Sequence, residues 1–101
     1  MFYTVVFTPE AEAQLTDLFS YIAGASSPEV AARYTDGIVT CCESLYTFPL
    51  RGTARDDIRP GLRITGYQKR VVIAFEVGTD RVNIIGIFYG GQDYETALQD
   101  E

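Results

Sequence analysis

The chain has 101 residues, a formal net charge of −6 and 47 % apolar residues. This length supports one domain, spanning residues 1–101, whose hydrophobic core needs neither disulfides nor a structural metal. No apolar run approaches the roughly 20 residues of a membrane-spanning helix, and no signal peptide precedes the first predicted strand. The absence of histidine removes the usual neutral-pH general base and the commonest metal ligand. We therefore expect a cytoplasmic protein without a metal or other cofactor.

The first half of the chain predicts one strand followed by two helices. Residues 2–7 are rich in β-branched and aromatic side chains, which favours a strand. Thr8-Pro9-Glu10 and Ser27-Pro28-Glu29 are each typical of a helix start, with a capping hydroxyl, a proline and an acidic residue. Apolar residues at helical spacing predict a first helix that stops at Gly24 and a second that runs to Phe48 before Pro49. The short break between them predicts an antiparallel hairpin.

Three small residues stand inside the second predicted helix. Gly37 should cost roughly 1 kcal/mol relative to alanine, and a close helix crossing is one explanation for it. Cys41 and Cys42 are adjacent, and a disulfide between them would distort the helix. We expect both cysteines to be reduced packing residues.

The second half predicts a surface connection and three antiparallel strands. Residues 50–61 contain one proline, two glycines and several charges without an apolar period, which is typical of a connection. Strands are expected over residues 62–67, 70–77 and 82–89, and the Gly-Thr-Asp turn between the last two is short enough for a hairpin. A short turn of helix is expected after Asp93.

The last predicted strand is apolar on both faces, so we expect it to be central. Alternation places Ile85 and Ile87 opposite Val82, Ile84 and Phe88. The sequence thus predicts an α+β fold in which a two-helix hairpin packs on a small, mostly antiparallel four-stranded sheet.

Positive charge is concentrated in residues 51–70. This segment carries six basic and two acidic side chains, whereas residues 1–50 carry one basic and six acidic ones. A confined basic patch on an acidic protein is unsuited to diffuse nucleic-acid binding but can meet phosphate or the carboxylates of a partner. A solvated connection without function is the alternative interpretation.

Four segments together resemble the RelE/ParE toxin superfamily of type II toxin–antitoxin systems. They are V-V-F-T-P-E-A-E-A-Q-L, S-P-E-V-A-A-R-Y, F-P-L-R-G followed by I-R-P-G-L-R, and I-I-G-I-F-Y-G-G-Q-D. The pieces I-R-P-G-L-R and G-I-F-Y-G-G-Q-D are more similar to the ParE-like, plasmid-stabilisation branch than to the RelE branch. The resemblance implies the element order β-α-α-β-β-β. It also implies a hetero-oligomer with a ParD-like antitoxin whose C-terminal segment wraps the toxin and folds as it binds.

The resemblance implies two alternative activities. RelE-type members cut messenger RNA on the ribosome; here Arg63 and Arg70 would clamp phosphate, and Tyr89 would give or accept the proton. ParE-type members inhibit DNA gyrase and perform no known chemistry. Against RNA cleavage, the G-G-Q-D-Y-E segment lacks the basic residues that RNA-cutting members tend to place there, and the net charge is acidic. We expect gyrase inhibition first, RNA cleavage second and a non-toxic partner in a repressor complex third.

A purely structural interpretation of the candidate catalytic residues also exists. Arg70 could pair across strands with Glu76 or Asp80, and Tyr89 could be an amphipathic edge residue.

We predict that the antitoxin or the target contacts the basic segment and the glycine-rich end of the last strand. Arginines offer fork-shaped donors, and glycines permit close backbone approach. We expect neither membrane association nor direct sequence-specific DNA binding. The predicted contact residues are Arg51, Arg55, Arg59, Arg63, Arg70, Tyr89, Gly90, Gly91 and Gln92.

Overall fold

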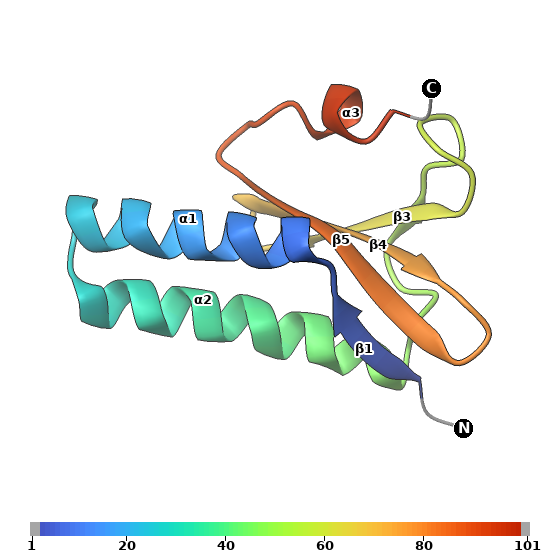
Figure 1. The fold of residues 1–101 in the computed structure, drawn as a ribbon, viewed down its shortest axis with the longest axis horizontal. Helices are drawn as coiled ribbons and strands as arrows, with labels where there is room; N and C mark the ends of the chain where they lie inside the picture. The colour runs from blue at the N-terminus through green and yellow to red at the C-terminus, as the bar shows by residue number, and fades with distance from the viewer. Residues whose placement is uncertain (1–2, 100–101) are drawn as a thin grey trace.

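A computed structural model describes residues 3–99, which form a mixed five-stranded sheet with a helical hairpin on one face (Figure 1). The strands are β1 (Thr4–Phe7), β2 (Thr53–Ala54), β3 (Leu62–Tyr67), β4 (Val71–Val77) and β5 (Arg81–Tyr89). The helices are α1 (Pro9–Ala25), α2 (Pro28–Glu43) and α3 (Tyr94–Ala97), with a 3-10 turn, η1 (Ser44–Tyr46), after α2. The predicted α+β class is confirmed. Phe2, which the sequence assigned to the first strand, lies outside the described residues.

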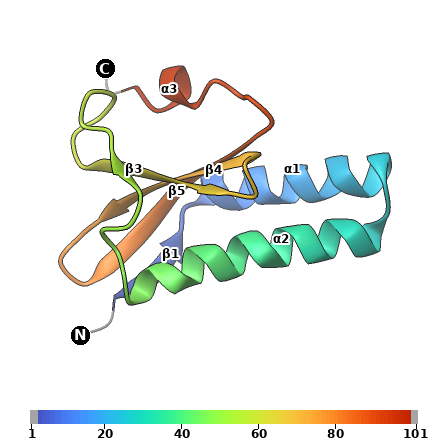
Figure 2. The same cartoon turned by 180° about the vertical axis from the view of Figure 1, so that it is seen from behind.

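The strands are ordered β1-β5-β4-β3-β2. β1 runs parallel to β5, and the remaining neighbours are antiparallel. β5 therefore has a strand on each side, while β4 occupies the middle of the sheet. Viewed from behind, α1 and α2 lie together on one side of the sheet and α3 lies on the other (Figure 2).

Both long helices begin where the capping pattern predicts. The Thr8 hydroxyl accepts a hydrogen bond from the Ala11 N–H at 3.2 Å, and the Ser27 hydroxyl accepts one from the Val30 N–H at 3.2 Å. These side chains satisfy backbone donors that the first helical turn leaves without intrahelical partners. The expected antiparallel hairpin is confirmed (Figure 1).

The main core lies between the helical hairpin and the sheet. Its fully buried members include Ile38 of α2, Phe75 of β4 and Ile84 of β5. Cys41 and Cys42 are both free thiols, as expected, and the Cys42 side chain is 0 % exposed. Burial raises the pKa of the Cys42 thiol to about 12, so this group stays protonated and packs as a small apolar side chain.

A smaller core covers the opposite face of the sheet. It consists of Leu62, Ala74, Phe88 and Leu98, with Tyr94 packed against them. The short helix expected after Asp93 is α3, which starts with the Asp93 carboxylate accepting from the Thr96 N–H at 3.2 Å. The sheet is thus covered on both faces, which explains why its central strands are apolar on both sides.

The sheet has five strands and not the predicted four, because β2 forms inside the expected surface connection. Thr53 pairs with Ile64, and Ala54 pairs with Arg63. Gly52 has a φ of +82°, and a Cβ there would collide with the Ile64 carbonyl, so a close backbone approach precedes the strand. A strand of two residues is too short to show an alternating pattern.

The second helix ends earlier than predicted. The α-helix stops at Glu43, and the 3-10 turn η1 follows before Phe48. The Phe48 side chain, which the apolar stripe assigned to the buried face, is 67 % exposed. The 3-10 turn has three residues per turn, so it takes the chain out of the 3.6-residue phase that the stripe assumed.

A bulge in β5 overturns the predicted alternation of that strand. Ala74 lies opposite Gly86, but Phe75 lies opposite Ile84, so Ile85 is an extra residue. Ile87 consequently joins Val82 and Ile84 in the main core, whereas Phe88 packs on the opposite face. An inserted residue changes the phase of every side chain after it.

Gly37 is explained by a side chain from the sheet and not by the helix crossing that the sequence suggested. A Cβ at Gly37 would collide with the Tyr67 hydroxyl oxygen and lie 2.9 Å from the ring carbon that bears it. Tyr67 belongs to β3 and lies across α2, where its ring packs edge-on against Tyr34 with centroids 5.6 Å apart. The glycine thus makes room for an aromatic contact between helix and sheet.

We predict that Gly37→Ala destabilises the fold. The gain in helix propensity of about 1 kcal/mol is outweighed by a packing clash of about 2 kcal/mol, which gives a net loss of about 1 kcal/mol. In a Tyr67→Leu background the clash is absent, so there the same substitution should be stabilising. Urea denaturation of the four proteins measures both effects. A stabilising Gly37→Ala change in the presence of Tyr67 would contradict this explanation.

Candidate binding site

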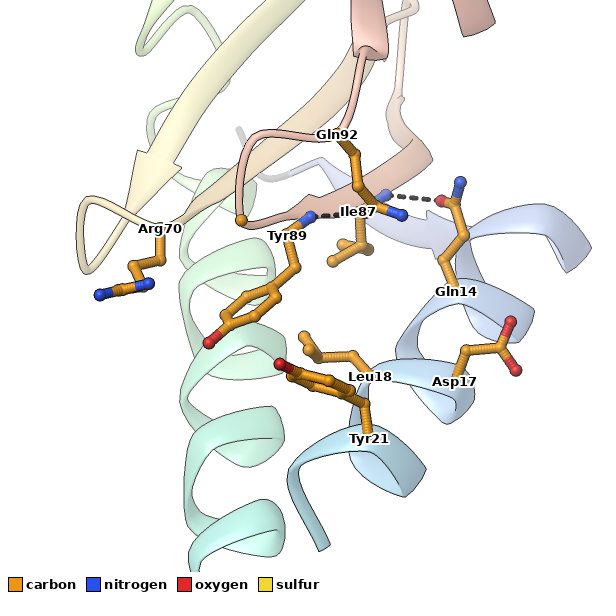
Figure 3. Close-up of a pocket in the computed structure, with 9 residues that line it drawn as sticks. Gln14, Asp17, Leu18, Tyr21, Arg70, Ile87, Tyr89 and Gln92 are labelled. Atoms are coloured by element: carbon orange, nitrogen blue, oxygen red, sulfur yellow. Dashed lines mark hydrogen bonds between the residues drawn. The ribbon is translucent and has the colours of Figure 1, made fainter. Parts of the chain in front are cut away.

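A pocket of about 510 Å³ opens between α1 and the C-terminal end of β5 (Figure 3). The α1 wall consists of Gln14, Asp17, Leu18 and Tyr21. The opposite wall consists of Ile87, Tyr89, Gly90 and Gln92, and Arg70 joins it from the turn between β3 and β4. Four of the predicted contact residues, Arg70, Tyr89, Gly90 and Gln92, therefore meet at one site.

The antiparallel register brings Arg70 and Tyr89 together. Val71 lies opposite Tyr89, and the Gly90 N–H donates to the Arg70 carbonyl at 2.8 Å. The Arg70 side chain is exposed and makes no ion pair with any residue from 3 to 99. Its guanidinium can therefore meet a carboxylate or phosphate of a binding partner.

The cross-strand ion pairs suggested for Arg70 are wrong. The Glu76 carboxylate instead lies 3.5 Å from Arg59, and the Asp80 carboxylate lies 3.7 Å from the neighbouring Arg81. Arg70 directly precedes β4, whereas Glu76 lies near the other end of that strand and Asp80 lies in the turn that follows it, so both carboxylates are about a strand length away.

Tyrosines from four elements form an aromatic cluster, and two of them, Tyr21 and Tyr89, line the pocket. Tyr89 stacks edge-on against Tyr34 with ring centroids 6.1 Å apart, and Tyr21 lies 6.0 Å from Tyr89 on the other side. The Tyr34 hydroxyl is buried and has no hydrogen-bond partner within the described part of the chain. Burial raises the pKa of Tyr34, and the neighbouring Tyr89 and Tyr67 raise it further, whereas Arg70 lowers it. The ring contacts of Tyr34 and Tyr21 thus hold the Tyr89 ring in place.

Two glutamine side chains bind the backbone of β5 inside the pocket. The Gln14 side-chain carbonyl accepts from the Ile87 N–H at 2.7 Å, and that of Gln92 accepts from the Tyr89 N–H at 2.7 Å (Figure 3). Gln92 was predicted as a contact residue, but Gln14 was missed. The sequence does contain a signal for Gln14, because it is a polar residue on the apolar face of α1, four positions before Leu18.

Arg63 lies away from Arg70 and Tyr89. It stands near the start of β3, and the turn that carries Arg70 follows the end of that strand at Tyr67, roughly 13 Å farther along. The Arg63 guanidinium donates to the carbonyls of Arg51 and Gly52 at 3.2 and 3.3 Å. The three residues that RNA cleavage would require are therefore not assembled at one place in this structure.

Arg55 ties the connection before β3 to the C-terminal helix. Its guanidinium donates to both carboxylate oxygens of Asp57 at 3.0 Å, to Glu95 at 2.7 Å and to the Tyr94 hydroxyl at 3.1 Å. The Arg55 side chain is 21 % exposed. This cluster, which we call the Arg55 clasp, holds α3 against the outer face of the sheet.

Two further arginines of the basic segment also make internal contacts. Arg51 donates to the Ser44 hydroxyl at 2.9 Å and lies over the Phe48 ring, 6.0 Å from its centroid. Arg59 pairs with Glu76. The segment that looked like one basic patch in the sequence is therefore divided among separate structural contacts, and Arg70 is the predicted contact arginine that lines the pocket.

The Arg55 clasp predicts a loss of α3 packing in acid. Hydrogen bonds from Arg55 lower the pKa of Asp57, and those from Thr96 lower the pKa of Asp93. A lowered pKa contributes stability that is complete above the unfolded value of about 4 and is lost as the pH falls below it. The protection of the Leu98 amide against hydrogen exchange should therefore fall below about pH 4, before the protection of the β4 amides falls.

An Arg55→Lys variant provides the matched control for this prediction. Lysine keeps the charge but cannot bind Asp57 with two parallel donors, so α3 should already exchange faster at neutral pH. Equal protection of Leu98 in both proteins across the acid range would contradict the role of the Arg55 clasp.

Other kinds of site find no support among the described residues. No three or more cysteine, aspartate or glutamate side chains within residues 3–99 are placed to hold a metal ion. None of the helices in this range is long and apolar enough to span a membrane. The pocket combines an arginine, two tyrosines and two glutamines whose side chains bind the backbone of β5.

The fold and the pocket thus define a small α+β binding domain. Residues 5–94 match the family described as "ParE toxin of type II toxin-antitoxin system, parDE", so the chain belongs to this family of toxin components. Among solved structures, a chain of the "Chromosomal ParDE TA system from P. aeruginosa" matches with a TM-score of 0.77 and 21 % identity. The match covers 87 % of this chain and 96 % of that chain, which shows a shared fold. No curated protein sequence matches the chain.

Proposed function

We propose that this toxin is neutralised by a cognate ParD-like antitoxin and that it acts in the cytoplasm by inhibiting DNA gyrase. Membership of the ParE family over residues 5–94 is the observation that carries the proposal. The partner is a second polypeptide, since the family belongs to two-component systems.

The pocket beside β5 is the proposed antitoxin site. It offers apolar surface from Leu18 and Ile87, aromatic surface from Tyr21 and Tyr89, and the guanidinium of Arg70. An acidic, amphipathic segment would satisfy all three features by folding onto the toxin. Contacts of a partner with the other four predicted arginines stay a prediction. These side chains already make internal contacts; they are Arg51, Arg55, Arg59 and Arg63.

Reversing the charge of Arg70 should weaken the antitoxin complex. We expect Arg70→Glu to raise the dissociation constant about tenfold at low salt and less at high salt, because added ions screen an exposed charge pair. Titration calorimetry with the polypeptide encoded by the adjacent reading frame measures this change.

Arg81→Glu is the matched control for the charge reversal. Arg81 is exposed at the opposite end of β5 and does not line the pocket. Equal affinities of the Arg70 and Arg81 variants at low salt would contradict a charge contact at the pocket.

Gyrase inhibition is supported over RNA cleavage by the separation of Arg63 from Arg70 and Tyr89. RNA cleavage without histidine needs cationic and proton-transferring groups around one phosphate, and this structure brings only two of the three candidates together. The proposed contact with gyrase consists of Arg70 and the three exposed residues that follow β5, which are Gly90, Gly91 and Gln92.

A supercoiling assay tests the target. We expect the purified chain to block supercoiling by gyrase and its preincubation with the antitoxin to restore the reaction. Full supercoiling at high excess of the toxin would reject gyrase as the target. Toxicity in cells with cleaved messages on ribosomes would then support the nuclease, and growth without the antitoxin would support a non-toxic repressor partner.

A further inference from the structure

We propose that Arg33, Lys69 and Arg70 form a cationic patch at the turn between β3 and β4, and that this patch binds carboxylates on the surface of the toxin's target protein. We call these three residues the turn patch. The inference rests on the proposed inhibition of gyrase, and it specifies the toxin surface and the partner chemistry of that contact.

The turn patch collects the cations that have no partner inside the fold. All eight cationic side chains of the sequence lie within residues 3–99. Five of them make ion pairs or hydrogen bonds; they are Arg51, Arg55, Arg59, Arg63 and Arg81. The three side chains of the turn patch make neither with any of the described residues, and all three residues are exposed. Their charges are therefore available to a partner.

The packing of β3 on α2 brings the three residues to one end of the molecule. Tyr67 ends β3 and lies against Gly37 of α2, and Lys69 and Arg70 follow it in the turn. Arg33 precedes Gly37 by four residues, so it stands on the same face of α2, roughly 6 Å farther toward the helix N-terminus. The helical hairpin extends past this end of the sheet in that direction (Figure 2).

The backbone of the turn is strained where it carries Lys69. Gln68 and Lys69 have φ values of +56° and +63°, and the Arg70 N–H donates to the Tyr67 carbonyl at 3.3 Å, which closes a two-residue hairpin turn. Two consecutive left-handed residues favour Asn-Gly, because a bulkier side chain is sterically disfavoured there. Such strain is typical of functional positions. A charge at position 69 that binds the target accounts for it.

The surrounding charges favour carboxylates of a protein over the phosphates of DNA. The net charge of −6 repels a polyanion such as duplex DNA, whereas the local cations attract carboxylates that approach closely. The exposed Glu29 and Asp36 lie one helical turn from Arg33 on either side, where they would repel a continuous row of phosphates. The guanidinium groups of Arg33 and Arg70 can each bind a carboxylate with two parallel donors.

The turn patch overlaps the proposed antitoxin site at one residue. Arg70 lines the pocket, but Arg33 and Lys69 are not among the lining residues. Substitutions at Arg33 and Lys69 therefore separate a contact with the target from a contact with the antitoxin.

Charge reversal at these two positions tests the patch. We expect Arg33→Glu and Lys69→Glu each to raise the toxin concentration that half-inhibits gyrase supercoiling about tenfold at low salt, and less at high salt. Affinity for the polypeptide encoded by the adjacent reading frame should stay within twofold of the original value. Arg81→Glu is the matched control, because Arg81 is exposed at the opposite end of β5 and should leave inhibition unchanged.

Relief of the strained turn supplies a test that unfolding cannot imitate. The double change Gln68→Asn with Lys69→Gly installs the favoured turn residues, so it should shift the urea midpoint upward while it weakens inhibition of gyrase severalfold. Gln68→Asn alone keeps the lysine and should inhibit as the original protein does. A double variant that is more stable and equally inhibitory would overturn the role of Lys69.

Two further results would reassign the patch. Loss of antitoxin affinity in the Arg33 and Lys69 variants, as large as the loss of inhibition, would make the patch part of the antitoxin site. Binding of the toxin alone to a labelled duplex of about 30 base pairs, lost in the Lys69→Glu variant, would assign it to phosphates. Either result overturns the contact with carboxylates of the target.

The failure of gyrase as the target can be told apart from the failure of the patch. If the variants inhibit gyrase as well as the original protein does, the patch falls and the proposed function stands. If the original protein does not inhibit gyrase, growth of cells that express it without the antitoxin decides. Growth restored by Arg33→Glu and Lys69→Glu then supports the patch on another target, whereas undiminished toxicity of both variants overturns it. A harmless original protein removes the proposed function and the patch together.

Discussion

The geometry of the site depends on the pairing between Thr8 and Ile84. Thr8 follows the last residue of β1, donates two hydrogen bonds to the Ile84 carbonyl and caps α1. The chain therefore leaves the sheet before β5 ends, and α1 crosses the space that a longer first strand would fill (Figure 1). The pocket is the consequence, because a helix cannot follow the edge of a strand closely enough to bond every backbone donor.

Electrostatic contacts in this protein mostly hold the chain to itself. Arg55 and Arg59 pair with carboxylates, and Arg63 binds backbone carbonyls, so their charges are partly neutralised before any partner arrives. Arg70 extends from a turn and pairs with no acidic residue of the described chain, which is why we propose this arginine for partner recognition. A partner carboxylate that binds here need not break an existing ion pair of the toxin, although the Arg70 guanidinium gives up part of its hydration.

The sequence by itself determined the elements that depend on local chemistry. The capping residues Thr8 and Ser27 defined both helix starts, and alternation together with short turns defined the three antiparallel strands. The glycine-rich end of β5 and Arg70 were also found as candidate contacts. The predictions of the helix starts and of the strands succeeded because caps, helical periods and hairpin turns involve residues that are close in the chain.

Only the tertiary structure decided the features that join distant segments. The bulge at Ile85 is set by pairing with β4 and reverses the phase of Ile87, so no single-strand pattern could predict which residues face the pocket. The two-residue β2 exists only because β3 lies beside it. Likewise, Gln14 and Tyr89 come from opposite ends of the chain and meet only in the fold. The arginines of the basic segment bind different internal partners, which the fold brings to them. Each of these outcomes depends on contacts across many residues, which periodicity along one element does not record.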